Sequence, residues 1–265
     1  MTQPSVGELL RTWRQRRRLS QLDLACEAEI STRHLSFLET GRARPSRGMI
    51  LHLAERLDVP LRDRNRLLNA AGFAAAYPER ALADPALEPA RRAIEVLLEG
   101  HGPYPALAVD RHWTMVAANR AASRLMATAA PALLRPPVNV LRLSLHPDGV
   151  ASRILNLGEW RAHILERLRR QIEATADEQL VDLRDELAAY PPPADASREL
   201  RADEPSLVVP LKLASPAGVL SLFSTTTVFG TPLDVTLSEL ALETFFPADA
   251  FRDEALRRAH APAGG

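Results

Sequence analysis

The sequence predicts two domains of different classes: an all-α N-terminal domain of five short helices, and a C-terminal α+β domain whose five strands form one antiparallel sheet with helices. Residues 5–72 show helical periodicity interrupted by short turns. Residues 73–104 contain several prolines that break this periodicity. From Pro105 onward the pattern is strands, then helices, then strands again. A chain of 265 residues is long enough for two domains.

The five N-terminal helices are predicted from capping residues and from apolar residues at helical spacing. Three serines are natural N-caps for the second, third and fourth helices: Ser20, Ser31 and Ser46. The fifth helix runs from Asp63 to Ala71 and stops at Gly72. Inward-facing apolar residues recur along all but the last helix: Val6, Leu10, Trp13, Leu24, Leu35, Leu38, Ile50, Leu53 and Leu57.

The remaining chain predicts a connecting helix and a mixed domain. Pro89–Leu98 is helical, and Ala106–Asp110 and Thr114–Asn119 are two strands followed by a short alanine-rich helix. Further helices are expected at 138–146, 158–175 and 177–190. Later segments are three β-rich runs, a terminal helix and a frayed tail: Ser206–Ala214, Gly218–Phe229, Val235–Phe246, Asp249–His260 and Ala261–Gly265. The predicted division is therefore 1–75, a linker with a connecting helix at 76–104, a domain at 105–260, and a tail at 261–265.

Charge and composition narrow the possible functions. The net charge is zero, but residues 1–75 hold 13 arginines against 8 acidic residues, about +5, which leaves about −5 for the rest. A basic segment joined to an acidic one predicts nucleic acid as the partner of the first and a different partner for the second. There is no long apolar stretch, the first residues contain no apolar segment of the kind that a leader sequence has, and there is one cysteine, Cys26. We therefore expect a cytoplasmic protein without a membrane span or a disulfide framework.

The N-terminal segment contains a specific run of motifs. It comprises the L-S-Q-x-x-L-A start at Leu19–Ala25, the I-S turn at Ile30–Ser31, the L-E-x-G exit at Leu38–Gly41, and the segment Arg42–Ser46 that opens the fourth helix. This pattern resembles the phage-repressor-like (Xre-type) helix-turn-helix family of DNA-binding domains. Arg14 and Glu39 match a family pair that joins the first helix to the third, so a structural role is implied for both.

The helix-turn-helix resemblance implies a set of DNA contacts, because the second helix of the motif enters the major groove. Arg33 can donate two hydrogen bonds to a guanine, and Phe37 can contact a thymine methyl group. Gln21 resembles the family's phosphate-contacting glutamine, and Arg42 and Arg44 would follow the DNA backbone. Under the alternative interpretation, Arg33 and the arginines between Arg14 and Arg18 are solvated surface charges. The predicted contacts are Gln21, Thr32, Arg33, Ser36, Phe37, Arg42 and Arg44.

Residues 78–252 resemble the MmyB-like ligand-binding domain. The segments that carry this resemblance are Tyr77–Arg80, Pro103–Leu107, Val109–Trp113, Ala117–Asn119, Asn139–Gly149, Asn156–Trp160, Thr231–Leu237 and Glu243–Pro247. What the resemblance implies is a PAS-like fold with a pocket for a long-chain, fatty-acid-like molecule.

Candidate pocket residues follow partly from the sequence itself, because a cavity between sheet and helices is a usual place for a small molecule. Apolar candidates are Val109, Met115, Leu125, Met126, Leu141, Leu145, Leu155, Trp160, Leu222 and Phe223. Taken one at a time, each of these residues fits plain core packing better than a cavity lining. Asn139, Arg142 and His146 share one helical face and could bind the carboxylate of an apolar acid. Alternatively, Asn139 caps its helix, Arg142 pairs with an acid such as Glu159, and His146 closes the helix.

No enzyme motif accompanies these features. The sequence contains no H-E-x-x-H, G-x-S-x-G, G-x-G-x-x-G or Walker-type loop, so neither an enzymatic activity nor a cofactor is expected, apart from a possible bound fatty acid or similar lipid. The predicted function is a homodimeric transcription regulator that binds a double-stranded DNA operator and responds to a hydrophobic effector. Two alternatives are a repressor of the same DNA-binding family controlled by a protein partner, and an enzyme of unknown type fused to a DNA-binding domain.

Overall fold

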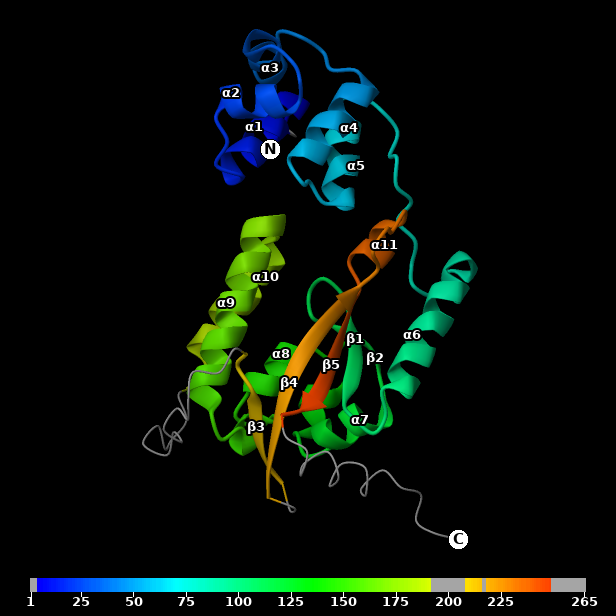
Figure 1. Ribbon diagram of the computed structural model, residues 1–265, viewed down its shortest axis with the longest axis vertical. Coiled ribbons are helices and arrows are strands. Elements are labelled where there is room, and N and C mark those ends of the chain that lie inside the picture. The colour runs from blue at the N-terminus through cyan, green and yellow to red at the C-terminus, as the bar shows by residue number, and fades with distance from the viewer. Residues whose placement is uncertain (1–3, 192–207, 216–217, 249–265) are drawn as a thin grey trace. The chain divides into compact units, whose positions relative to one another are not determined.

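The structure, a computed structural model, describes residues 4–191, 208–215 and 218–248. These residues divide into two compact units (Figure 1). The N-terminal unit comprises residues up to Ala81 together with Thr231–Ser238. The C-terminal unit comprises the described residues of Leu82–Gly230 and those from Glu239 onward.

All five predicted helices of the N-terminal unit are present. They are α1 (Val6–Arg16), α2 (Gln21–Glu27), α3 (Thr32–Glu39), α4 (Arg47–Arg56) and α5 (Leu61–Ala70). The serine caps are confirmed, because the hydroxyls of Ser20, Ser31 and Ser46 each accept a hydrogen bond from a backbone N–H in the first turn. Helix α5 starts two residues before the predicted Asp63, directly after Pro60.

The N-terminal unit has its own hydrophobic core. Its fully buried large side chains are Leu10, Leu24, Leu35, Leu38, Ile50, Leu53, Leu57, Leu67 and Leu68. Gly7 lets α1 lie directly on the end of α3, because a Cβ atom at this position would be 2.5 Å from the carbonyl oxygen of Leu38. Helix α1 therefore packs against one side of α3, and the side of α3 that carries Arg33 and His34 is exposed.

The predicted five-stranded antiparallel sheet is present in the C-terminal unit (Figure 1). Its strands are β1 (Ala106–Val109), β2 (Met115–Ala118), β3 (Leu211–Ser215), β4 (Gly218–Val228) and β5 (Ala241–Pro247). The spatial order is β2-β1-β5-β4-β3, and every neighbouring pair is antiparallel. The first and last described strands of the unit, β1 and β5, therefore meet at the centre of the sheet.

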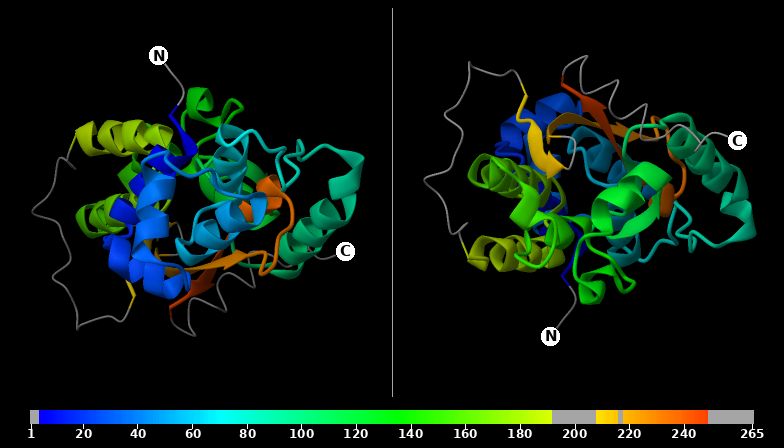
Figure 2. Two further views of the ribbon diagram at one scale, coloured as in Figure 1. Left: turned by 90° about the horizontal axis from the view of Figure 1, so that it is seen from above. Right: turned by 90° about the horizontal axis from the view of Figure 1, so that it is seen from below.

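The helices of this unit agree with the predicted order. They are α6 (Glu88–Gly100), α7 (Arg120–Met126), α8 (Val140–Leu145), α9 (Leu157–Thr175) and α10 (Glu178–Ala189), with short 3-10 turns at Pro85–Leu87, Pro131–Leu134 and Ala151–Arg153. Helices α9 and α10 lie side by side in both Figure 1 and Figure 2. The core joins one face of the sheet to α7, α8, α9 and α10.

One predicted strand is only partly a strand. The β-rich run Val235–Phe246 contains a short helix, α11 (Val235–Ser238), before β5 begins at Ala241. Asp234 starts this helical turn, because its side chain accepts a hydrogen bond from the backbone N–H of Thr236 and its carbonyl accepts one from Ser238. The capping aspartate outweighs the β preference of Val235 and Thr236. The predicted helix Asp249–His260 and tail Ala261–Gly265 lie outside the described residues.

Candidate functional site

The exposed face of α3 carries the side chains that the sequence predicts to contact DNA. Leu35 and Leu38 point into the core, which leaves Arg33 exposed and Phe37 half-buried on the opposite side. The guanidinium carbon of Arg33 lies 5.3 Å from the ring centroid of Phe37, and that of Arg42 lies 6.0 Å from it. Two cations therefore flank one aromatic ring on an open helix face.

The other predicted contacts lie on the same motif. Thr32 and Ser36 are half-buried positions of α3, and Arg44 is exposed in the segment between α3 and α4. The pair predicted to be structural is confirmed: the guanidinium of Arg14 donates to both carboxylate oxygens of Glu39, at 2.6 and 2.9 Å. Arg14 also donates to the carbonyl of Leu19, at 2.8 Å, so this pair joins α1, α3 and the start of α2.

Gln21 has a contact that the sequence does not show. Its side-chain amide donates a hydrogen bond of 2.8 Å to Glu39. Burial raises the pKa of the Glu39 carboxyl, but the hydrogen bonds from Arg14 and Gln21 outweigh this, and the pKa lies below its ordinary value of 4.5. The Gln21 side chain therefore joins the start of α2 to the end of α3 by a hydrogen bond, and its amide N–H points into the protein.

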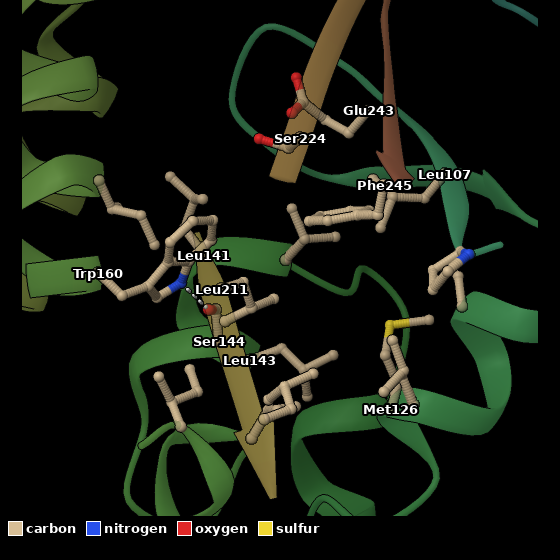
Figure 3. A pocket seen from close by; sticks show the side chains of 18 of the residues that line it. Leu107, Met126, Leu141, Leu143, Ser144, Trp160, Leu211, Ser224, Glu243 and Phe245 are labelled. Atoms are coloured by element: carbon tan, nitrogen blue, oxygen red, sulfur yellow. Dashed lines mark hydrogen bonds between the residues drawn. The ribbon is translucent and has the colours of Figure 1, made fainter. Parts of the chain in front are cut away.

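The C-terminal unit contains an apolar cavity between the sheet and helices α7, α8 and α9 (Figure 3). Its volume is about 110 Å³. For comparison, an apolar cavity of about 150 Å³ in another protein binds benzene. Apolar side chains surround it: Leu107, Trp113, Ala122, Leu125, Met126, Val140, Leu141, Leu143, Val150, Ile154, Trp160, Ile164, Leu211, Leu213 and Phe245.

Strand alternation decides which sheet residues reach the cavity. In β5, Glu243 and Phe245 line the cavity. Leu107 of β1, which pairs with Glu243, and Ser224 of β4, which pairs with Phe245, line it as well. Phe223 was predicted to line the pocket, but it points to the other face of β4. There its ring stacks on Phe246, with centroids 5.4 Å apart.

The remaining predicted apolar liners divide between cavity and core. Trp160 lines the cavity, where its indole N–H donates to the hydroxyl of Ser144 at 3.0 Å (Figure 3). Leu125, Met126 and Leu141 line it too. Leu145 is 4% exposed and Met115 is partly buried, but both belong to the packed core outside the lining.

The predicted polar face of α8 also lies outside the lining residues. Asn139 caps α8 by accepting from the backbone N–H groups of Leu141 and Arg142. Arg142 pairs with Glu186 on α10 at 2.7 Å rather than with the suggested Glu159. His146 packs edge-on against Tyr190. Helix α8 thus turns this face toward α10, and its opposite face, with Leu141 and Ser144, toward the cavity.

The polar end of the cavity comes from residues that the sequence analysis did not single out. These are His163 and Arg167 on α9, Ser224 on β4 and Glu243 on β5. In Figure 3, Glu243 and Ser224 lie together at one end, while Leu143 and Met126 lie at the other. One signal in the sequence points to this end: Glu243 is a charged residue within an apolar strand. Trp160, His163 and Arg167 also share a helical spacing on α9.

The described residues show neither a cluster of side chains that could hold a metal ion nor a helix long and apolar enough to cross a membrane. Comparison with family models gives two matches. Residues 5–67 match a helix-turn-helix domain, and residues 90–259, more than half of the chain, match the MmyB-like transcription regulator ligand binding domain. The chain belongs to the MmyB-like transcription regulators. A search among curated proteins found no match.

Both resemblances inferred from the sequence are therefore confirmed. The helix-turn-helix domain makes DNA a partner, and the MmyB-like domain makes a small molecule the effector. Together the two matches indicate a transcription regulator. The MmyB-like match includes the residues of the cavity, so the cavity lies in the part of the chain that defines the family.

Proposed function

We propose that this chain is a cytoplasmic, homodimeric regulator whose affinity for its operator changes when a long-chain, fatty-acid-like molecule occupies the cavity. The observation that carries the proposal is the lining of the cavity, because apolar walls with one polar end suit an apolar molecule with a polar head. Each methylene buried there contributes about 0.8 kcal/mol before ordering costs.

The path of the chain supports coupling between the cavity and DNA binding. Strands β4 and β5 supply Ser224, Glu243 and Phe245 to the cavity wall. The chain that joins these strands, Thr231–Ser238, belongs to the N-terminal unit. There Asp234 pairs with Arg80 at 3.0 Å, and the N–H of Val235 donates to the carbonyl of Pro78 at 2.9 Å. A displacement of β4 or β5 by a ligand would therefore pull on the DNA-binding unit through covalent bonds.

DNA contact is proposed for the face of α3. Arg33 would bind a guanine in the major groove, with Thr32, Ser36 and Phe37 beside it, and Arg42 and Arg44 would bind phosphates. Arg33 and Phe37 project from the helix that enters the groove in this motif.

Two measurements on the full-length protein test the proposal. Organic extraction followed by mass spectrometry should release an acyl compound from the purified protein. Fluorescence anisotropy with a selected operator should show that a saturating acyl compound changes the dissociation constant for DNA at least about fivefold. The proposal of a lipid effector is contradicted if no acyl compound is extracted and acyl compounds of all chain lengths leave the affinity for DNA unchanged. That outcome would favour control by a protein partner.

A further inference from the structure

The charged groups at the polar end of the cavity are already paired with each other. Arg167 donates from both terminal nitrogens to the carboxylate of Glu243, at 2.5 and 3.0 Å. Arg167 also donates to the hydroxyl of Thr226 at 2.6 Å, and its guanidinium carbon lies 4.4 Å from the ring centroid of Trp113. The Glu243 side chain is 5% exposed, and its negative charge is balanced by Arg167, with one further hydrogen bond from the hydroxyl of Thr226 at 2.9 Å.

Among the described residues that line the cavity, this pairing leaves no unpaired cation for a ligand. Arg167 and Glu243 are the arginine and the acid of the lining, and their formal charges cancel. Burial lowers the pKa of His163 below its ordinary value of 6.5, and the positive charge of Arg167 lowers it further, so the imidazole is neutral at pH 7. A ligand carboxylate that bound Arg167 would displace Glu243 and leave a buried charge unpaired, which is costly.

Two neutral side chains at the same end remain available for hydrogen bonds. Among the described residues, neither the ring nitrogens of His163 nor the hydroxyl of Ser224 has a hydrogen-bond partner, although His163 stacks on Trp160 with centroids 5.4 Å apart. The hydroxyl can donate and accept, and a neutral imidazole offers one donor and one acceptor. These groups match an alcohol or an ester carbonyl.

We infer that the cavity selects a long-chain molecule with an uncharged, hydrogen-bonding head group, such as a fatty alcohol or a fatty ester, over a free carboxylate. The inference rests on the proposed function and names its ligand class. His163 and Ser224 bind the head group, while the Arg167–Glu243 pair closes this end as a neutral unit. A fatty acid enters only when protonated, and at pH 7 about one carboxyl in 500 is protonated if its pKa is near 4.3.

The test compares a fatty acid, the primary alcohol and the methyl ester of one chain length, by calorimetry on delipidated full-length protein at pH 7. The alcohol or the ester should bind between about 10-fold and 500-fold more tightly than the acid. If no member of the series binds, the proposed lipid effector itself is wrong. If the acid binds as tightly as the alcohol and ester or more tightly, the head-group inference is overturned while the lipid effector stands.

A charge-changing variant gives a second, independent reading. Glu243→Gln keeps acceptors for Arg167 and Thr226 but gives the cavity a net positive charge. The affinity for the acid relative to that for the alcohol should therefore rise by about tenfold or more. Glu186→Gln is the matched control, because it neutralises an arginine-paired glutamate whose partner Arg142 lies outside the cavity. If the folded Glu243→Gln variant has the same ratio of acid affinity to alcohol affinity as the wild type, the inference is overturned. If the variant fails to fold, the ratio measured for the wild-type protein decides.

Discussion

Arg33 and Arg44 are both exposed arginines of the DNA-binding unit, but their positions give them different expected roles. Arg33 stands on α3 beside Phe37, where in the proposed docking a side chain reaches base edges. Arg33→Ala should therefore weaken operator binding by about 1–3 kcal/mol and relax the preference at one base pair. The measurement is a competition assay against operators substituted at each position.

Arg44→Ala is the matched control for this experiment. A phosphate contact carries no sequence information, so this variant should weaken binding to all DNA sequences alike. The slope of log affinity against log salt concentration should fall by about one, as for the loss of one phosphate contact. If Arg33→Ala behaves like Arg44→Ala, with uniform loss across sequences, the proposed docking of α3 is wrong.

Glu39 makes the stability of the DNA-binding unit depend on pH. Its side chain is 1% exposed and accepts from Arg14 and Gln21, and its pKa is lowered from 4.5. A carboxyl with a lowered pKa stabilises the fold above its unfolded pKa, and this contribution is lost as the pH falls below about 4.5 through the folded pKa. Glu39→Gln should cost about 3–5 kcal/mol at pH 7, because it leaves the buried positive charge of Arg14 without a compensating negative charge.

Urea unfolding at several pH values measures both effects. The wild-type protein should lose free energy of unfolding between about pH 5 and pH 3, and the variant should lose less over the same interval because a glutamine side chain at this position does not titrate. Equal slopes in the two proteins would show that other carboxyls govern the acid sensitivity.

At the scale of elements, the packing of α1 on α3 depends on the absence of a side chain at position 7. A methyl group at Gly7 would lie 2.5 Å from one backbone carbonyl oxygen of α3 and 2.7 Å from the next. Gly7→Ala should therefore destabilise the unit by about 1–3 kcal/mol and weaken DNA binding, because one helix must shift. Gly48→Ala is the control, since its nearest neighbour atom is 4.0 Å away. Thermal unfolding and DNA titration of both variants would separate a packing defect at position 7 from the general effect of replacing glycine by alanine. Equal losses of stability and DNA affinity in the two variants would contradict the close contact between position 7 and the carbonyl oxygens of α3.

Segment Thr231–Ser238 is the element expected to transmit the ligand signal. Asp234 holds it, because its carboxylate accepts from Arg80 and from the N–H of Thr236, while its side chain is only 6% exposed. Asp234→Ala removes both bonds. Ligand affinity should stay near the wild-type value, whereas the change in DNA affinity on adding ligand should shrink several-fold.

The control for this prediction is Asp185→Ala, which breaks an exposed pair with Arg184 on α10. Anisotropy titrations with and without a saturating acyl alcohol give the coupling for each variant. A full response in Asp234→Ala would mean that the signal passes elsewhere.

At the scale of the whole molecule, the number of bases that one helix-turn-helix can read predicts a dimer. A single α3 contacts only a few base pairs, so adequate specificity requires two copies on half-sites about 10 bp apart or a multiple of that. Sedimentation of the full-length protein should show two chains per operator, and footprinting should show a two-fold symmetric site. A monomer on an asymmetric half-site would contradict this arrangement.

Much of this architecture follows from local sequence. Serine caps, helical spacing and alternation are set by neighbours within a few residues, and so five N-terminal helices and five strands are predicted near their observed places. The face of α3 follows too, since the burial of Leu35 and Leu38 decides where Arg33 and Phe37 point. The run Val235–Phe246 was misjudged because the Asp234 cap competes with β preference.

The head-group end of the cavity was decided by tertiary structure alone. Arg142 has the charge and spacing of a ligand-binding residue, yet its helix is rotated so that it meets Glu186 on α10. Arg167 and Glu243 lie 76 positions apart and meet only because α9 packs over the face of the sheet that carries Glu243. The sequence by itself determined the two fold classes, most of the described elements and the family. Which polar groups face the cavity depends on how helices rotate against the sheet, and that is set by packing between distant residues rather than by local pattern.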